Sequence, residues 1–444
     1  MLIAAGRLRR KRPIARIVAV GLGLLGLALY VAVLIALPVF HFPQPGGRYS
    51  IGTLTYHWVD THRTEAFSAD ESARRELMVQ IWYPARSGSP LQSSPAPALS
   101  PSPLLPQPPR APYVQDGDAL AKAFSRLTPL PKALFRQLKY VTTHAIASAP
   151  MAQDRPNYPV LLFLQGAIGF RQMNTFQVEA LVSNGYIVVA IDQPYTAATV
   201  VFPNGREVGA LPLAQMLPLI RQSFSLAAIP PTLHGRALEK GIVPYLAQDV
   251  SFALNQLAAL NQADPNAVLT GRLDLLRVGA FGVSLGGIVG AEACRREPRL
   301  KACLFMDAPM PVDVVKSGLQ QSAMWITRDA ETMRLERRRS GGWPEAEISD
   351  HLNSMRAVFD GMQGAGYFVQ VPGLFHINLT DIPYWSPALR WLRVVGPIDA
   401  QRAHDIINVY SLAFFNRHLL GRAEALLGGP ASHYPEVIFE WRQP

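Results

Sequence analysis

The stretch RVGAFGVSLGGIVGAEAC, residues 277–294, constrains the architecture of this chain more than any other segment. Its first residues are typical of a buried strand, and its last residues are small enough for a helix packed closely on a sheet. Between them stands the pattern G-x-S-x-G, with Ser284 at its centre. A serine in this setting lies on a sharp strand-to-helix turn that exposes its hydroxyl, so we predict that Ser284 is a nucleophile.

Strands and helices alternate on both sides of this stretch. Strands are expected at 160–164, 186–191, 277–281, 302–306, 323–327 and 367–371, and helices at 172–183, 245–262, 284–296 and 400–419. Two earlier runs, 49–56 and 75–84, also have the alternating apolar residues of strands. Such a series predicts a mostly parallel central sheet with helices on both faces. Together with the serine turn it predicts an α/β protein of the α/β-hydrolase fold.

A serine becomes a strong nucleophile when a histidine takes its proton, and in α/β-hydrolases that histidine follows the serine and the acid in the chain. His376 meets this requirement, because it lies in the loop VPGLFHINLTD after the last expected strand. The other histidines precede Ser284, lie on helical stretches or stand near the C-terminus. His351, for example, falls in a charged helical stretch, where a solvated or packing role is expected. We therefore predict His376 as the catalytic base.

Two aspartates are candidates for the acid that orients His376. Asp307 directly follows the strand expected at 302–306, and Asp329 closely follows the next one at 323–327. Both lie at the carboxyl ends of strands, where active-site loops gather. The usual topology of the fold favours the later strand and Asp329, although either residue could instead cap a helix. The residues alone leave this choice open.

The negatively charged intermediate of ester hydrolysis needs backbone donors. We expect the N–H of Leu285, the residue after the serine, to supply one. The other is expected from the loop after the strand VLLFL, residues 165–169, with Ala167 as the candidate. Glycines on both sides of Ala167 would let the backbone approach a substrate.

The N-terminus has the pattern of a membrane element. Residues 17–40 carry no charge and are long enough to cross a bilayer of about 30 Å as a helix. Six basic side chains lie just before them, between Arg7 and Arg16, and contribute much of the net charge of +10. By the positive-inside rule we expect a single-pass signal anchor with the catalytic domain exported, on the periplasmic or extracellular side of the membrane. A cleaved signal peptide and a buried core helix are the alternatives.

The remaining charge is nearly balanced, so no nucleic-acid partner is expected. The expected organisation is a basic cytoplasmic segment at 1–16, the anchor at 17–40 and a catalytic domain at 49–444, with a Pro/Ser-rich insertion at 87–112 and a cap at 197–243. Within the cap, the apolar run 211–231 is the candidate for an acyl-binding lid. No metal or cofactor motif is apparent. We expect the two cysteines, Cys294 and Cys303, to be buried thiols rather than a disulfide.

Several of these segments together resemble the platelet-activating factor acetylhydrolase family, the phospholipase-A2-type α/β-hydrolases, and especially its bacterial, membrane-anchored members. They are LPVFHFP (37–43), RELMVQIWYP (75–84), VTTHAIASAP (141–150), YPVLLFLQGAIGFR (158–171), FMDAPMPV (305–312) and GLFHINLTD (373–381). The resemblance favours Asp307 over Asp329 as the acid. The chain departs from the family at Gln165 and Val283, where histidines are common.

The resemblance implies calcium-independent hydrolysis of short or oxidised sn-2 acyl chains on phospholipids, with a lipid or small-molecule ester as partner and no metal. The residues themselves support carboxylic-ester hydrolysis through a serine. One alternative is an esterase of the dienelactone or polyester type that acts on non-lipid esters. Another is a catalytically silent hydrolase fold that serves as a binding protein.

Overall fold

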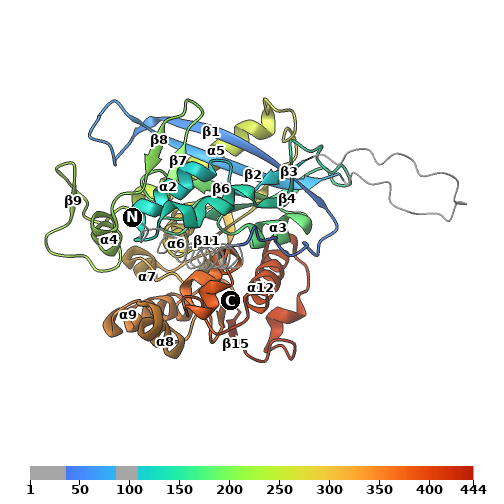
Figure 1. Ribbon diagram of the computed structural model, residues 1–444. Coiled ribbons are helices and arrows are strands. Elements are labelled where there is room, and N and C mark those ends of the chain that lie inside the picture. The colour runs from blue at the N-terminus through green and yellow to red at the C-terminus, as the bar shows by residue number, and fades with distance from the viewer. Residues whose placement is uncertain (1–36, 87–108, 444) are drawn as a thin grey trace, which may run out of the picture.

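The computed structural model describes residues 37–86 and 109–443 and places an eleven-stranded sheet at their centre (Figure 1). Its strands are β1 (Ser50–Thr64), β2 (Arg74–Ala85), β3 (Arg110–Pro112), β4 (Thr142–Ala147), β5 (Tyr158–Leu164), β6 (Ile187–Asp192), β11 (Leu273–Val283), β12 (Leu300–Met306), β13 (Ser322–Thr327), β14 (Gly366–Gln370) and β15 (Ile438–Arg442). They are ordered β15-β14-β13-β12-β11-β5-β6-β2-β1-β4-β3. This arrangement confirms the expected α/β architecture.

The middle of the sheet is parallel. The six strands β6, β5, β11, β12, β13 and β14 run in one direction, whereas β2 pairs antiparallel with β6, and β15 pairs antiparallel with β14. Parallel neighbours bring their carboxyl ends to the same edge of a sheet. The register pairs Val283 at the end of β11 with Met306 at the end of β12. The residues that follow these two, Ser284 and Asp307, are therefore neighbours at that edge.

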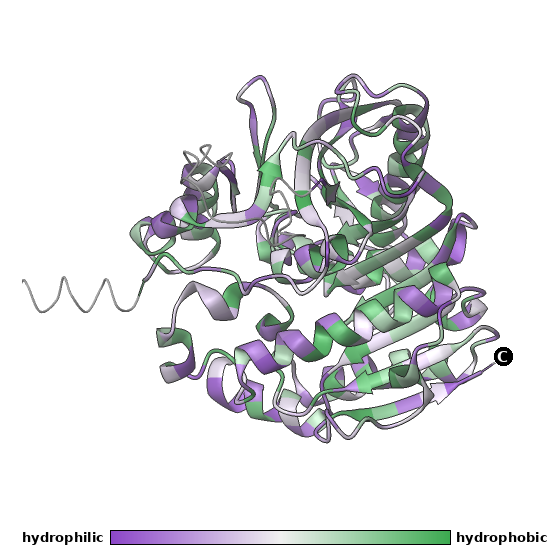
Figure 2. Cartoon of the chain, turned by 90° about the vertical axis from the view of Figure 1, so that its right-hand side faces the viewer, coloured by the Kyte–Doolittle hydropathy of each residue, from purple (hydrophilic) through white to green (hydrophobic). Residues whose placement is uncertain are grey.

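Two hydrophobic layers cover the two faces of the sheet, because side chains of successive strand residues point to opposite faces. On β5, Leu162 and Leu164 pack with α5 (Val243–Gln262) and α6 (Leu285–Arg296). Between them, Phe163 packs into the other layer, with α3 (Thr175–Ser183) and α12 (Ala400–Leu420). Several helices carry hydrophilic and hydrophobic residues in alternating bands (Figure 2), whereas α3 and α6 are buried along nearly their whole length.

The region between β6 and α5 forms a separate part of the molecule beside the sheet. It contains a hairpin of β7 (Thr199–Val201) and β8 (Glu207–Gly209), the helix α4 (Leu213–Arg221) and a second hairpin of β9 (Thr232–Leu233) and β10 (Arg236–Ala237). Pro218 lies inside α4. The expected cap at 197–243 therefore has one helix at its centre, and the remainder of the apolar run 211–231 is irregular.

The sequence did not predict two elements near the ends of the described regions. The edge strand β15 near the C-terminus extends the sheet beyond β14. The Pro/Ser-rich insertion expected at 87–112 ends in a short strand, β3, which pairs with β4. Most of that insertion lies outside the described residues.

The segment predicted to span a membrane, 17–40, lies largely outside the described residues. Within residues 37–86 and 109–443, none of the helices combines the length and apolarity that a membrane crossing requires. The last residues of the predicted segment are described, and Phe40 is buried there against Phe42 and Tyr113.

The expectation of two buried thiols is wrong. Cys294 and Cys303 form a disulfide, with their Cα atoms 6.7 Å apart, and both side chains are fully buried. The bond joins the last turn of α6 to β12. Because α6 begins after Ser284 and β12 ends before Asp307, the disulfide links the two elements that carry these residues.

Candidate active site

Ser284 lies on the turn between β11 and α6 in a backbone conformation that L-residues seldom adopt. Its φ is 55° and its ψ is −124°, which carries a cost that the surrounding structure must hold in place. The glycines of the motif make this turn possible. A Cβ on Gly286 would lie 1.9 Å from the carbonyl oxygen of Leu164, and one on Gly282 would lie 2.4 Å from backbone atoms of Gly286. Both approaches are closer than any side chain allows, so the pattern G-x-S-x-G is a packing requirement here.

Asp307 stands beside this turn, on the first residue after β12. The N–H of Ser284 donates to the carbonyl of Met306 at 2.9 Å, and the N–H of Asp307 donates to Ile326 on the next strand at 2.9 Å. Asp307 also has a positive φ, 45°, and its side chain is fully buried. Hydrogen bonds to both adjacent strands therefore hold it at the centre of the sheet edge.

Four side chains surround the Asp307 carboxylate, two at each oxygen. Oδ2 lies 2.5 Å from His376 Nδ1 and 2.8 Å from Arg328 Nε. Oδ1 accepts a hydrogen bond of 3.1 Å from Thr327 Oγ1 and lies 3.2 Å from His351 Nε2. Burial alone would raise the pKa of Asp307, but Arg328 and the two histidines outweigh it and hold the pKa well below its usual value. The carboxylate is therefore ionised at neutral pH.

Asp329, the alternative acid, has a different role. It is the N-cap of α8 (Ala330–Ser340), where its Oδ1 accepts from the backbone N–H of Thr332 at 2.9 Å. Its Oδ2 accepts from the Thr332 hydroxyl at 2.6 Å. The structure thus brings Asp307, and not Asp329, to His376.

His376 begins a short 3₁₀ helix, η2 (His376–Leu379), in the loop after β14. Its backbone N–H donates to Glu336 Oε1 on α8 at 3.2 Å, and its ring lies 5.2 Å from that of Trp343. Further along the loop, the Asp381 carboxylate accepts from the first N–H groups of α3 at 2.8 and 3.1 Å. The loop is thereby anchored at both ends, while the His376 side chain stays about one-quarter exposed.

Among the described residues, Ser284 Oγ makes no hydrogen bond, including none to His376. Such catalytic hydrogen bonds are often loose in unliganded enzymes and tighten when substrate binds.

The predicted oxyanion donors lie on either side of Ser284. A Cβ on Gly166 would lie 3.3 Å from the Ser284 Cβ, so the loop after β5 passes directly beside the serine. The N–H groups of Ala167 and Leu285 make no hydrogen bond to a backbone carbonyl of the described residues. The two departures from the family pattern, Gln165 and Val283, are both buried next to this loop and turn.

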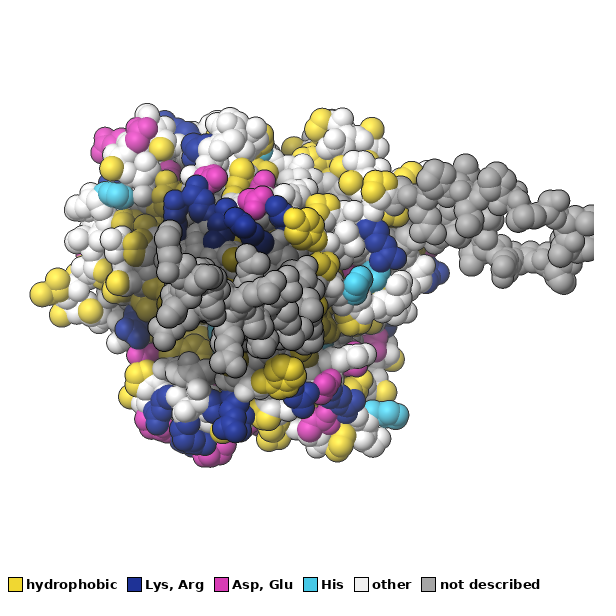
Figure 3. All heavy atoms as spheres, viewed as in Figure 1, with side chains coloured by type: hydrophobic (Ala, Val, Ile, Leu, Met, Phe, Trp, Pro, Cys, Tyr) yellow, Lys and Arg dark blue, Asp and Glu magenta, His cyan; other side chains and the backbone are white. Residues whose placement is uncertain are grey.

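A cavity of about 750 Å³ opens over Ser284. One wall is apolar and comes from α4, α6 and α7 (Val312–Ser317); the other is polar and comes mainly from α9 (Glu345–Asp360). The apolar wall includes Leu217, Ile220, Phe224, Ile288, Met310 and Val315, and the polar wall includes Glu347, Asp350, His351, Asn353 and Ser354. Hydrophobic side chains also gather on the outer surface near α4 and β9, at the left of Figure 3.

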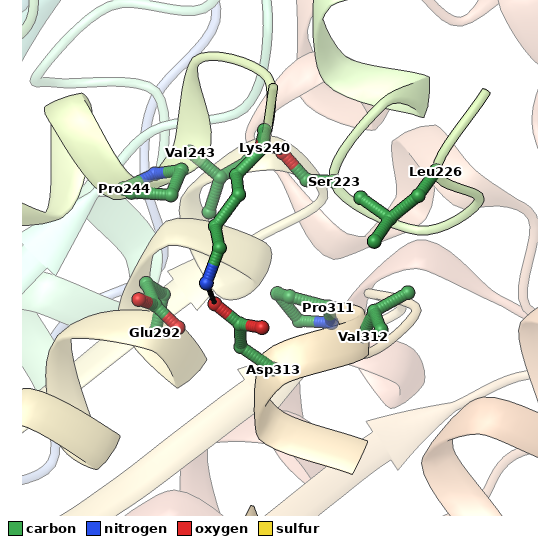
Figure 4. A pocket seen from close by; sticks show the side chains of 9 residues that line it. All are labelled: Ser223, Leu226, Lys240, Val243, Pro244, Glu292, Pro311, Val312 and Asp313. Atoms are coloured by element: carbon green, nitrogen blue, oxygen red, sulfur yellow. Dashed lines mark hydrogen bonds and ion pairs between the residues drawn. The ribbon is translucent and has the colours of Figure 1, made fainter. Parts of the chain in front are cut away.

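A second, smaller hollow shows how the cap is attached to the body of the protein (Figure 4). Lys240, just before α5, reaches Asp313 on α7 with 2.7 Å between Nζ and Oδ2. In the same close-up Leu226 of the cap lies opposite Val312 and Pro311. The segment after α4 is therefore held against α7, which forms part of the cavity wall.

Sequence reasoning missed Arg328 and His351, which lie against the Asp307 carboxylate, and Trp343, whose ring lies beside those of the two histidines. Arg328 is fully buried, pairs with both Asp307 and Glu336, and has its guanidinium 4.7 Å from the Trp343 ring. Arg328 could have been identified from the sequence, because it is a charged residue directly after an apolar strand and next to a candidate acid. No local signal identifies His351, because 44 residues separate it from Asp307 along the chain. No group of three or more metal-ligating side chains was found in the part of the chain that the structure describes.

Comparisons with known proteins identify the family of the chain. A family model described as platelet-activating factor acetylhydrolase, isoform II, matches residues 38–425. A probable 1-alkyl-2-acetylglycerophosphocholine esterase of Arthroderma benhamiae is 26% identical over 303 residues, which cover 64% of this chain and 67% of the relative. A platelet-activating factor acetylhydrolase of Gallus gallus is 21% identical over 278 residues, covering 59% of this chain and 62% of the relative. These matches span about two thirds of the relatives' length.

A solved structure with a similar fold is the ferulic acid esterase from Streptomyces cinnamoneus. It superposes with a TM-score of 0.66 at 26% sequence identity, over 90% of this chain and 99% of the esterase. The similarity therefore covers nearly the whole of that enzyme.

Proposed function

The chain belongs to the platelet-activating factor acetylhydrolase family and is a carboxylic-ester hydrolase, and from this premise we propose that Ser284, His376 and Asp307 are its catalytic triad. Ser284 attacks the ester carbonyl while His376 takes its proton, and His376 then returns that proton to the leaving alcohol. Asp307 holds the imidazole and stabilises its charged form. Water activated by His376 then releases the acyl group from Ser284.

One observation carries this proposal. The Asp307 carboxylate lies 2.5 Å from His376 Nδ1, at the sheet edge where the adjacent strand ends in the strained Ser284 turn. An aspartate at Nδ1 leaves Nε2 as the nitrogen that exchanges protons with the serine. The N–H groups of Leu285 and Ala167 are the proposed donors to the oxyanion, since both lack a backbone acceptor among the described residues.

For the substrate we propose phospholipids with short or oxidised sn-2 acyl chains. The relatives' activities support this class. The cavity also supports it, because an apolar wall faces a polar one above Ser284, as an amphiphilic ester requires. Its volume of about 750 Å³ is far larger than an acetyl group needs and accommodates part of the leaving group as well.

The helix α4 and the residues after it form the proposed lid. Leu217 and Ile220 of α4 line the cavity, while Leu226 and Ile229 beyond it are 49% and 87% exposed. Exposed apolar side chains that follow a helix lining such a cavity suit contact with a bilayer surface. With the proposed anchor at 17–40, the exported domain would be held beside such a surface.

A second candidate substrate is an aromatic acyl ester, which the similarity to the ferulic acid esterase favours. The same triad would act on it, and the cavity is large enough for an aromatic acid. The two candidate substrates differ in which part of the molecule contacts the apolar wall.

The nucleophile is tested with a fluorophosphonate probe on the full-length protein, Ser284→Ala and Ser225→Ala. Ser225 lines the same cavity but lies outside the strained turn, so it is the matched control. We expect labelling and p-nitrophenyl acetate hydrolysis to be lost in Ser284→Ala and kept in Ser225→Ala. A folded Ser284→Ala protein that still reacts with the probe would contradict the proposal.

The substrate class is tested by comparing kcat/KM for 1-alkyl-2-acetylglycerophosphocholine, its long-chain sn-2 analogue and methyl ferulate. We expect the acetyl phospholipid to be preferred over both. A higher kcat/KM for methyl ferulate would replace the phospholipid proposal with the aromatic one, while leaving the triad intact.

A further inference from the structure

On the basis of the proposed triad, we infer that His351 is a positioning residue that holds the Asp307 carboxylate in the orientation His376 needs. His351 lies on α9, whereas His376 lies in the loop after β14. Its Nε2 is 3.2 Å from Asp307 Oδ1. The two imidazoles therefore share one carboxylate, with one at each oxygen.

Asp307 Oδ1 is the acceptor that His351 Nε2 approaches. The residue is 4% exposed, and its buried Nε2 lies 3.2 Å from Asp307 Oδ1 without the alignment of a hydrogen bond. Catalytic contacts of this kind are often poorly aligned in unliganded enzymes and tighten when substrate binds. An ionised carboxylate accepts only, so the contact can tighten when Nε2 carries the proton of neutral His351.

Neutrality itself follows from the neighbours. Burial lowers the pKa of His351, against the opposing effect of Asp307, and the positive charge of Arg328 adds to the lowering. Arg328 already supplies the positive charge that keeps the Asp307 carboxylate ionised. His351 then serves as a neutral donor with a defined tautomer, and its ring is held 5.0 Å from that of Trp343.

The geometry of the carboxylate explains why a fourth donor matters. Arg328 and His376 both approach Oδ2, and Thr327 and His351 approach Oδ1. Without His351, only the Thr327 hydroxyl would hold Oδ1. The carboxylate could then rotate toward Arg328 and leave His376 Nδ1 poorly aligned, which weakens orientation of the base.

His351 also connects the triad to the substrate cavity, because it lines the polar wall of that cavity. A change at this position could therefore act on substrate binding, on Asp307 or only on stability. These roles differ in their kinetic signatures. A positioning role lowers kcat and leaves KM nearly unchanged, whereas a binding role raises KM.

The test uses full-length protein with His351→Leu, His351→Gln and the control Ser349→Ala. Glutamine can present an N–H near the place of Nε2, and Ser349 is an exposed residue of α9 that does not line the cavity. We expect His351→Leu to lower kcat about 10- to 100-fold, the range for loss of one hydrogen bond to a charged group that forms when the contact tightens. KM should stay within about twofold, His351→Gln should recover most of kcat, and Ser349→Ala should leave kcat unchanged.

Action through Asp307 is tested by combining His351→Leu with Asp307→Asn. Once Asp307 is replaced, replacing a positioning residue as well should lower kcat little further. The losses of kcat in the two single variants should therefore be strongly non-additive. Fully additive losses, an unchanged kcat in His351→Leu, or an equal loss in His351→Gln with native-like near-UV circular dichroism would each overturn the inference. Failure of the proposed triad can be distinguished from failure of this inference, because Asp307→Asn alone would then retain activity.

Discussion

The ends of β12 and β13 each carry an aspartate on neighbouring strands, and the two carboxylates meet very different surroundings. Asp307 is fully buried and has His376, Arg328, Thr327 and His351 around it. Asp329 is partly exposed and is satisfied within its own helix by Thr332. Both aspartates therefore lie at the end of a strand. Of the two, only Asp307 has its carboxylate in contact with described side chains that are distant in the chain.

This difference shows what separates a helix cap from a candidate catalytic acid. A cap needs donors that lie three residues ahead in the chain, which Asp329 has. A triad acid needs donors from other elements that keep it ionised and oriented while it is buried. Asp307 receives them from β13, from the segment before α8, from α9 and from the His376 loop. The comparison can be tested at each of these contacts.

The largest effect is expected from Asp307→Asn. An amide cannot stabilise the charged imidazole and favours the wrong tautomer, so kcat should fall about 10³- to 10⁴-fold. The measurement is steady-state hydrolysis of p-nitrophenyl acetate, with Asp329→Asn as the control. A greater loss in Asp329→Asn would reverse the roles of the two residues.

The next effect is expected from Arg328→Met, measured as the free energy of unfolding in urea. Arg328 is buried between two carboxylates, those of Asp307 and Glu336. Removing it leaves both without their cation, which should cost about 3–5 kcal/mol. Arg334→Met is the control, because Arg334 makes only solvent-exposed ion pairs, with Glu331 on α8 and Glu345 on α9, and its loss should change stability far less. Equal losses would argue against a special role for the buried pair.

The pH dependence of stability should report whether Asp307 is held ionised in the folded protein. The folded-state pKa of Asp307 is well below its usual value, so its ionised form stabilises the fold above the unfolded pKa of about 3.9. That contribution is lost as the pH falls below about 4 toward the folded pKa. We expect the stability difference between wild type and Asp307→Asn to shrink over this acid range. A difference that stays constant from pH 7 to pH 3 would mean that Asp307 is not held ionised.

The smallest effect is expected from Asp329→Ala. Loss of an N-cap typically costs about 1 kcal/mol, and kcat should stay within about twofold because Asp329 does not touch His376. Asp329→Asn should cost still less, since asparagine caps helices nearly as well as aspartate. Thermal unfolding and esterase activity on the same preparations would check both. A large loss of activity in Asp329→Ala with an intact fold would contradict this assignment.

Much of the fold was predictable because it depends on local patterns. The strands around 160–164, 277–281, 302–306 and 323–327 are short apolar runs, and the observed strands contain each of them. The edge strand β15 was missed because its sequence, IFEWR, mixes charged and apolar residues. The disulfide was missed because pairing of Cys294 with Cys303 depends on how α6 packs on β12.

The sequence by itself pointed to Ser284 and His376, because a local motif marks the serine turn and a place after the last strand marks the late histidine. Their catalytic roles stay predictions, although the structure places Asp307 against His376. Only the tertiary structure showed which of Asp307 and Asp329 lies against His376, and it alone revealed Arg328 and His351 beside Asp307. The physical reason is that burial and charge compensation arise from elements far apart in the chain, and these meet only when the sheet and its helices pack together.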